Sequence, residues 1–307
     1  MSGVRKRIRH CGRYGIQSDF RQVSYYTYTP TRAPTGRRRK SQTSTPKQRA
    51  LNNKRSARYL EALTHANFGR GDLLLGLSYA EKHAPKDETE AKKEFGNFIR
   101  RLNYRRKKKN LPPARWVAVT EIGKKGRIHH HVIMDAELDR DEVEEVWGRG
   151  YANTKRLKPD PREGLLPVIG YIAKTFKEDD RPKGRRKWEC SKNLIRPWDS
   201  VNDNPRMMSR KKIRQMKDLP EDSESMRQII EADNPNYELI SVEKEYREDT
   251  GGWYFFCRMK LSTRGRADAD NTSTAARKNE QEKQKCQRTI RHGNARAKPP
   301  PADTGPQ

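Results

Sequence analysis

Three consecutive histidines stand out because the spacing of two of them suits a metal site. His129, His130 and His131 fall within Ile128–Met134, a run rich in β-forming residues. Side chains alternate along a strand, so His129 and His131 share one face and His130 faces the other. The apolar neighbours of His130 predict that it lies on the covered side as a hydrogen-bonded structural residue.

A carboxylate is expected beside these two imidazoles. Trp116–Glu121 is a second β-rich run, and the three-residue loop Lys124–Gly126, with Gly126 left-handed, would pair Glu121 with His129. A shift of one residue would break this alignment. Two imidazoles and a carboxylate can hold a divalent cation, Mg²⁺ or Mn²⁺, and leave positions open for a phosphate. The alternative is that the histidines are merely surface residues.

A tyrosine and a lysine three residues apart form the second candidate group. Apolar residues at helical spacing predict a helix over 161–177, with Tyr171 off the apolar stripe and Lys174 on the same side. A phenol has an ordinary pKa near ~10 and is a weak nucleophile at neutral pH. A metal on the phosphate and a cation near the oxygen would lower the barrier, and Lys177 could replace Lys174. Tyr171 could also be an amphipathic residue at the core edge.

The elements that must position these groups follow a split-βαβ order. They are a strand at 72–80, a helix at 87–109, strands at 116–121 and 128–134, a helix from about 139 to Gly148, a strand at 151–157 and the helix at 161–177. This order predicts an α+β, ferredoxin-like fold with a central antiparallel sheet. Helices are expected on one face of the sheet, and the other face is expected to be open for function.

Charge divides the chain into four regions. The net charge is +28, and residues 1–58 hold sixteen basic residues against the single acid Asp19. We expect a disordered basic arm at 1–58, the core at 59–180, a basic accessory region packed on the core at 181–261, and a disordered polar tail at 262–307. Nucleic acid is the expected partner, and no apolar run is long enough for a membrane helix. Four scattered cysteines favour a reducing cytoplasm.

Basic residues near the two candidate groups are expected to contact DNA. They are Lys124, Lys125, Arg127, Lys177, Arg185, Arg186 and Lys187. The last three precede Trp188, and basic residues beside an aromatic suit phosphate contact combined with base stacking. A solvated basic surface would have the same composition.

At these residues the chain resembles the HUH endonucleases, above all the single-tyrosine rolling-circle replication initiators of phages, plasmids and integrated elements. The matching segments are Leu73–Ser78 for the first strand, Gly126–His131 for the metal strand, Glu121 for the third ligand and Tyr171–Lys174 for the nucleophile helix. The resemblance covers roughly residues 70–180. Lys187–Pro197 is also similar to the segment after the tyrosine helix in phage-type initiators.

The resemblance implies a metal-dependent nick in single-stranded or hairpin origin DNA. Tyr171 would form a 5′-phosphotyrosyl intermediate, Glu121, His129 and His131 would bind the metal, and Lys174 would stabilise negative charge. The free 3′-OH would prime a host DNA polymerase, aided by a helicase, in the cytoplasm of a bacterial host. Removal of 1–58 would then weaken DNA binding and spare nicking.

Two other functions stay open. A transposase or relaxase could use the same tyrosine chemistry. A non-catalytic nucleic-acid-binding protein could share the topology, although such modules stack bases on sheet aromatics and the two central strands here offer histidines.

Overall fold

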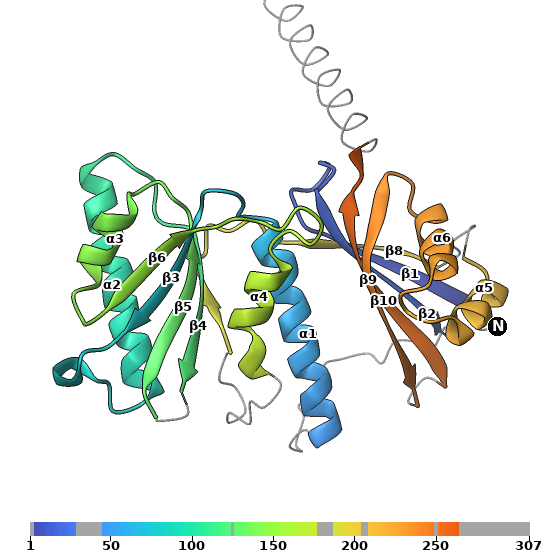
Figure 1. Ribbon diagram of the computed structural model, residues 1–307, viewed down its shortest axis with the longest axis horizontal. Helices are drawn as coiled ribbons and strands as arrows, with labels where there is room; N and C mark the ends of the chain where they lie inside the picture. Colours follow the sequence, from blue (N-terminus) through green and yellow to red (C-terminus); the bar gives the residue numbers. More distant parts are fainter. Residues whose placement is uncertain are drawn as a thin grey trace, which may run out of the picture.

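Two five-stranded antiparallel sheets make up most of the structure (Figure 1). The computed structural model describes residues 3–28, 45–123, 126–176, 187–203, 208–248 and 251–263. The first sheet has the strand order β6-β3-β5-β4-β7, and the second has the order β8-β1-β2-β10-β9. Helix α1 (Pro46–His65) lies between the two sheets (Figure 1).

The elements around the first sheet come from the middle of the chain. They are β3 (Leu73–Ser78), η1 (Glu81–His83), α2 (Glu88–Lys108), β4 (Trp116–Ile122), β5 (Ile128–Met134), α3 (Arg140–Trp147), β6 (Ala152–Arg156), α4 (Leu166–Ile172), η2 (Lys174–Phe176) and β7 (Glu189–Cys190). The elements around the second sheet come from both ends. They are β1 (Gly3–His10), β2 (Phe20–Tyr28), β8 (Trp198–Asn202), α5 (Arg210–Asp218), α6 (Glu224–Ala232), β9 (Tyr237–Arg247) and β10 (Gly252–Leu261).

The expected α+β class and the split-βαβ order are confirmed in the first sheet. The chain runs β3-α2-β4-β5-α3-β6, and the four strands lie in the spatial order β6-β3-β5-β4, all antiparallel. Asp87 caps α2 by accepting a hydrogen bond from the Glu90 amide at 2.8 Å. Asp139 caps α3 in the same way, and Gly148 ends it with a φ of 58°.

Helices cover both faces of the first sheet, which corrects the expectation of one covered and one open face. On one face, α2 and α3 bury Phe98 and Trp147 against β3 and β5. On the other face, Leu63 of α1 and Ile169 of α4 pack against Val119 of β4 and its neighbours. The alternation of β4, which puts Val117 and Val119 on the second face, requires this apolar cover.

The last helix of the expected core is shorter than its apolar stripe indicated. α4 begins at Leu166 rather than at 161, and residues 174–176 form the separate 3₁₀ turn η2. Asp160 and Gly164 exchange two backbone hydrogen bonds of 2.8 and 2.9 Å and hold the preceding segment in a tight turn. Gly164 adopts a φ of +62°, which is outside the right-handed helical region.

The structure corrects the expectation of a disordered arm at 1–58. Residues 3–10 and 20–28 form β1 and β2 of the second sheet, and residues 46–58 belong to α1, while 29–44 lie outside the described residues. Lys6 occupies a buried position of β1 and forms a 2.8 Å ion pair with Asp233. Because a charged residue stands among the buried positions, the strand alternation is hidden in the sequence.

The second sheet buries one face under α5 and α6. Val23 and Tyr25 of β2 and Phe255 of β10 form this core with Met216 and Ile230 of the two helices. The described parts of 187–261 therefore contribute β7 to the first sheet and most of the second sheet. Of the expected tail at 262–307, residues 264–307 lie outside the described residues. None of the described helices is long and apolar enough to cross a membrane.

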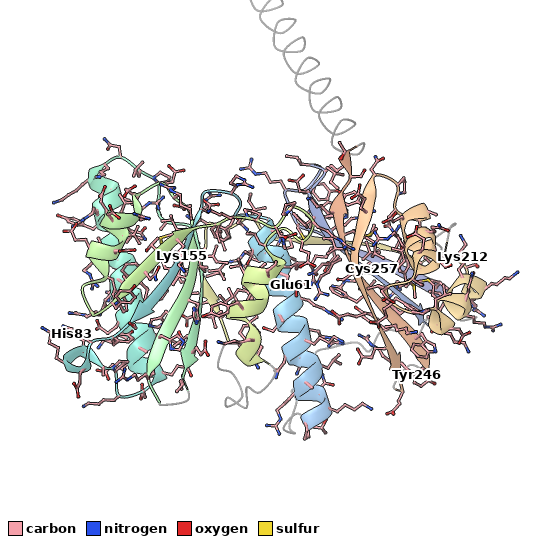
Figure 2. All side chains as sticks on the ribbon, in the orientation of Figure 1. Glu61, His83, Lys155, Lys212, Tyr246 and Cys257 are labelled. Carbon is pink, nitrogen blue, oxygen red and sulfur yellow. The ribbon has the colours of Figure 1, made fainter. Side chains whose placement is uncertain are left out.

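Helix α1 joins the two sheets through opposite faces. Its apolar face carries Leu60 and Leu63 against the first sheet. Its polar face carries Glu61, labelled in Figure 2, which receives two hydrogen bonds of 2.8 and 2.9 Å from the Arg258 guanidinium of β10. Arg58 donates to Glu243 of β9 at 2.9 Å, so ion pairs connect α1 to the second sheet.

Candidate metal centre and tyrosine site

The β4–β5 hairpin sets the geometry of the site. Glu121 pairs with His129 across the two strands, which is the register that the sequence predicts. The Gly126 amide donates to the Gly123 carbonyl at 2.8 Å, and Gly126 has a φ of +74°. A left-handed glycine at this point closes a three-residue loop, and the loop length fixes which strand residues face each other. Lys124 and Lys125 lie outside the described residues.

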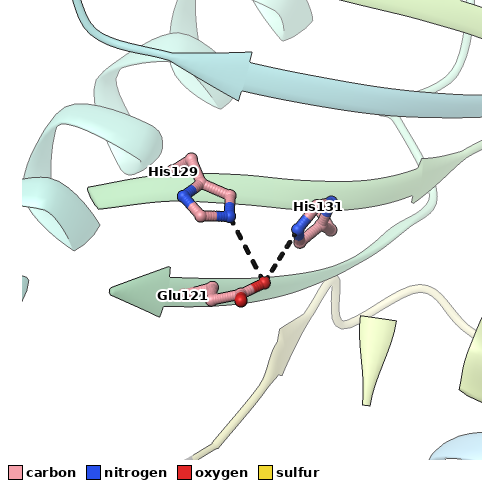
Figure 3. Close-up of side chains that lie close together, drawn as sticks. All are labelled: Glu121, His129 and His131. Carbon is pink, nitrogen blue, oxygen red and sulfur yellow. Dashed lines mark hydrogen bonds and ion pairs between the residues drawn. The ribbon is translucent and has the colours of Figure 1, made fainter. Parts of the chain in front are cut away.

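Glu121, His129 and His131 gather on one face of the hairpin (Figure 3). The Nε2 atoms of His129 and His131 lie 3.3 and 3.0 Å from the same atom, Oε2 of Glu121. The candidate ligand atoms of the three residues all lie within 4.8 Å of one another. This group could hold a metal ion.

The environment of the cluster fits that role. Glu121 and His131 are buried, whereas the side chain of His129 is 29 % exposed, so the cluster is open on one side. Burial and the neighbouring His129 lower the pKa of His131, although its hydrogen bond with Glu121 opposes the shift. A neutral imidazole keeps a lone pair for a cation, and the carboxylate supplies negative charge. The donor set therefore fits a divalent cation.

His130 faces the opposite side and has a structural role. It is fully buried, its Nε2 lies 2.8 Å from the Tyr79 hydroxyl, and its Nδ1 lies 3.0 Å from Oγ1 of Thr120. Burial lowers the pKa of His130 to about 3, so the ring is neutral at physiological pH. Sequence reasoning missed both partners. Strand alternation could have indicated Thr120, which pairs with His130 in register, but no local signal points to Tyr79.

Tyr171 lies beside the cluster on α4. Its ring centroid is 5.2 Å from that of His131, and the residue is 52 % exposed. The Lys174 ammonium lies 4.8 Å from the centre of the Tyr171 ring and 3.7 Å from Oε1 of Glu121. The structure thus brings together the five residues that sequence reasoning assigned to metal binding and catalysis. Ile169 and Ile172 of the same helix are buried, and this fixes the direction in which Tyr171 points.

The expected DNA-binding residues are only partly placed. Arg127 is exposed beside the hairpin loop. Lys187 donates to the Phe176 carbonyl at 3.1 Å. Trp188 donates to Ser56 at 3.1 Å and stacks on Tyr59 of α1, so its ring is used in packing rather than offered to a base. The remaining expected contacts lie outside the described residues, namely Lys177, Arg185 and Arg186, together with the two loop lysines.

A comparison with protein families bears on the same region. Residues 72–179 match the family of replication-associated protein ORF2/gene II protein. The match covers about a third of the chain and runs from β3 through η2, so it includes the histidine cluster, Tyr171 and Lys174. It supports a role in replication initiation. No curated protein and no solved structure shows significant similarity to the chain.

Proposed function

We propose that the protein nicks single-stranded origin DNA, with Tyr171 as the nucleophile, and so starts rolling-circle replication. The observation that carries the proposal is the position of an exposed tyrosine against a Glu-His-His cluster, with a lysine next to both. The family match over the same residues supports replication initiation as the biological setting.

In the proposed step, the Tyr171 hydroxyl oxygen attacks the scissile phosphorus and gives its proton to solvent. The bond between phosphorus and the 3′ oxygen breaks, and that oxygen takes a proton from solvent to become a free 3′-OH. The DNA stays attached through a 5′-phosphotyrosyl bond. Attack of a 3′-OH on that bond reverses the step and rejoins the strands. An unpaired strand or an extruded hairpin would present the phosphate to the site.

The other residues assist the attack. Lys174 stabilises the negative charge that develops on the phenolate oxygen and the phosphate. Glu121, His129 and His131 would hold Mg²⁺ or Mn²⁺, which when bound polarises the phosphate. The free 3′-OH is a suitable primer for a host DNA polymerase, with a helicase to displace the strand.

The test is covalent trapping on denaturing gels. The full chain is incubated with Mn²⁺ and a single-stranded DNA library that has a randomised central segment, and attached DNA is then sequenced. We expect an adduct with the wild-type protein and none with Tyr171→Phe. Tyr104→Phe is the matched control, because Tyr104 is 63 % exposed and also lies under a lysine, Lys108, but without the histidine cluster.

The same experiment separates the alternatives. Absence of an adduct, together with salt-dependent DNA binding that needs no metal, would favour a non-catalytic binding protein and overturn the proposal. A transposase or relaxase would form the same adduct, so the sequence of the trapped DNA distinguishes an origin from the end of a mobile element.

A further inference from the structure

The face of the second sheet that looks toward α1 contains a cleft of about 510 Å³. Strand alternation produces this face, because the neighbouring residues Val23, Tyr25 and Phe255 point the other way into the core with α5 and α6. The lining includes five arginines and one carboxylate, which are Arg7, Arg9, Arg55, Arg58, Arg247 and Asp199. The cleft is therefore strongly positive.

Part of this positive charge is available to a ligand. Asp199 binds Arg7 at 2.5 Å and Arg9 at 2.9 Å, so one carboxylate serves two guanidinium groups. Arg55 is exposed on α1 and forms no ion pair or hydrogen bond with any other residue that the structure describes. Arg58 is buried, and its Nε has no hydrogen-bond partner among the described residues. A phosphate would supply the acceptor oxygens that these groups lack.

Two tyrosines form the floor of the cleft beside the arginines. Tyr26 of β2 and Tyr254 of β10 are directly opposite in register, with ring centroids 5.7 Å apart, and both are partly exposed. The Tyr254 hydroxyl lies 2.8 Å from Oγ of Ser24, and the Arg247 guanidinium lies 3.6 Å from the centre of the Tyr254 ring. Fixed aromatic rings on an open sheet face are a platform on which unpaired bases stack.

We propose that this cleft is a second DNA-binding site, which holds a short single-stranded segment with its phosphates on Arg55 and Arg7 and a base on Tyr26 or Tyr254. The choice of DNA as the polyanion rests on the proposed function. Helix α1 connects the two sites, because Leu63 packs on Ile169 of the tyrosine helix while Arg55 lines the cleft. The cleft would retain one part of the strand while Tyr171 acts on another.

The first test measures affinity in the intact chain. Fluorescence anisotropy follows a labelled single-stranded oligonucleotide of about 20 nucleotides without metal, across a salt series, so no cleavage is needed. We expect Arg55→Gln to weaken binding roughly threefold to tenfold and to reduce the slope of log K against log salt by about 0.7. Arg100→Gln is the matched control, since Arg100 is an exposed helical arginine on α2, which covers the far face of the first sheet. Equal affinity for wild type and Arg55→Gln would overturn the proposal.

The second test locates the bases. Single-stranded DNA carrying 5-iodouracil is irradiated in complex with the protein, and cross-linked peptides are identified by mass spectrometry. We expect cross-links to Tyr26 or Tyr254, and none at these positions with a duplex of the same sequence. Cross-links confined to the first sheet would overturn the proposal. Neither test depends on Tyr171, so a failure to form the covalent adduct would refute nicking, whereas only loss of these binding signals refutes the cleft.

Discussion

The Lys174 ammonium lies 3.7 Å from Oε1 of Glu121, while the other carboxylate oxygen of Glu121 faces His129 and His131. One carboxylate therefore connects the candidate metal cluster with the cation beside Tyr171. Because Glu121 is only 8 % exposed, water screens both interactions weakly. Removing Glu121 and removing Lys174 should consequently have different and separable effects.

Glu121→Gln keeps the size of the side chain and removes its negative charge. We expect the affinity for Mn²⁺, measured by calorimetry, to fall by at least about tenfold, since the ligand set loses its only anion. The fold should persist, because the two histidines can still hydrogen-bond to the amide oxygen. Glu137→Gln, at an exposed position just after β5, is the control and should bind Mn²⁺ normally. Unchanged affinity in Glu121→Gln would exclude it as a ligand.

Lys174→Gln removes the cation beside the Tyr171 ring. We expect the rate of covalent adduct formation to fall by about a hundredfold, which is typical for loss of a group that stabilises transition-state charge. Mn²⁺ affinity should not fall, since Lys174 is not among the ligands. The measurement is a single-turnover time course at saturating metal. A rate equal to that of the wild type would assign the charge stabilisation to another residue.

His130→Ala should destabilise the protein, whereas His129→Ala should not. His130 is fully buried with two hydrogen-bond partners, so its loss leaves a cavity and two unsatisfied groups and should cost about 3 kcal/mol. His129 is partly exposed, and its loss should cost less than about 1 kcal/mol while it weakens metal binding. Urea denaturation measures both free energies of unfolding. Equal values for the two variants would contradict the assigned roles.

The ion pairs between α1 and the second sheet should make the protein sensitive to acid. Burial alone would raise the pKa of Glu243, but Arg258 and Arg58 outweigh it and lower the pKa from 4.5 to about 2. A lowered folded-state pKa gives stability that is present above pH 4.5 and is lost as the pH falls toward 2. Glu243→Gln should therefore have a lower Tm than the wild type at pH 6, and the difference should shrink between pH 4.5 and 2.5. A constant difference would show that the ionised carboxylate contributes nothing.

Deletion of residues 1–28 should unfold the second sheet. The deletion removes β1 and β2 and exposes the core that Val4, Val23 and Tyr25 share with α5 and α6. Limited proteolysis should then cut within 208–263, and the thermal transition of this sheet should disappear. A dispensable basic arm would instead leave proteolysis and the transition unchanged.

Local patterns account for the first sheet and for the members of the candidate site. The alternation of β4 and β5, the loop that ends at Gly126 and the caps Asp87 and Asp139 each act within a few residues. Short-range rules therefore determine the element order, the pairing of Glu121 with His129 and the opposite orientation of His130. The spacing from Tyr171 to Lys174 is local as well.

Only the tertiary structure decided how the ends of the chain are used. β1 and β2 pair with β8 and β10, which are about two hundred residues away in sequence, and Lys6 is tolerated in a buried position because Asp233 neutralises it there. The contact of Tyr171 with His131 and the arginine-tyrosine cleft also join residues far apart in the chain. Such contacts depend on long-range packing and on paired charges, and hydrophobic periodicity within a single segment carries no information about either.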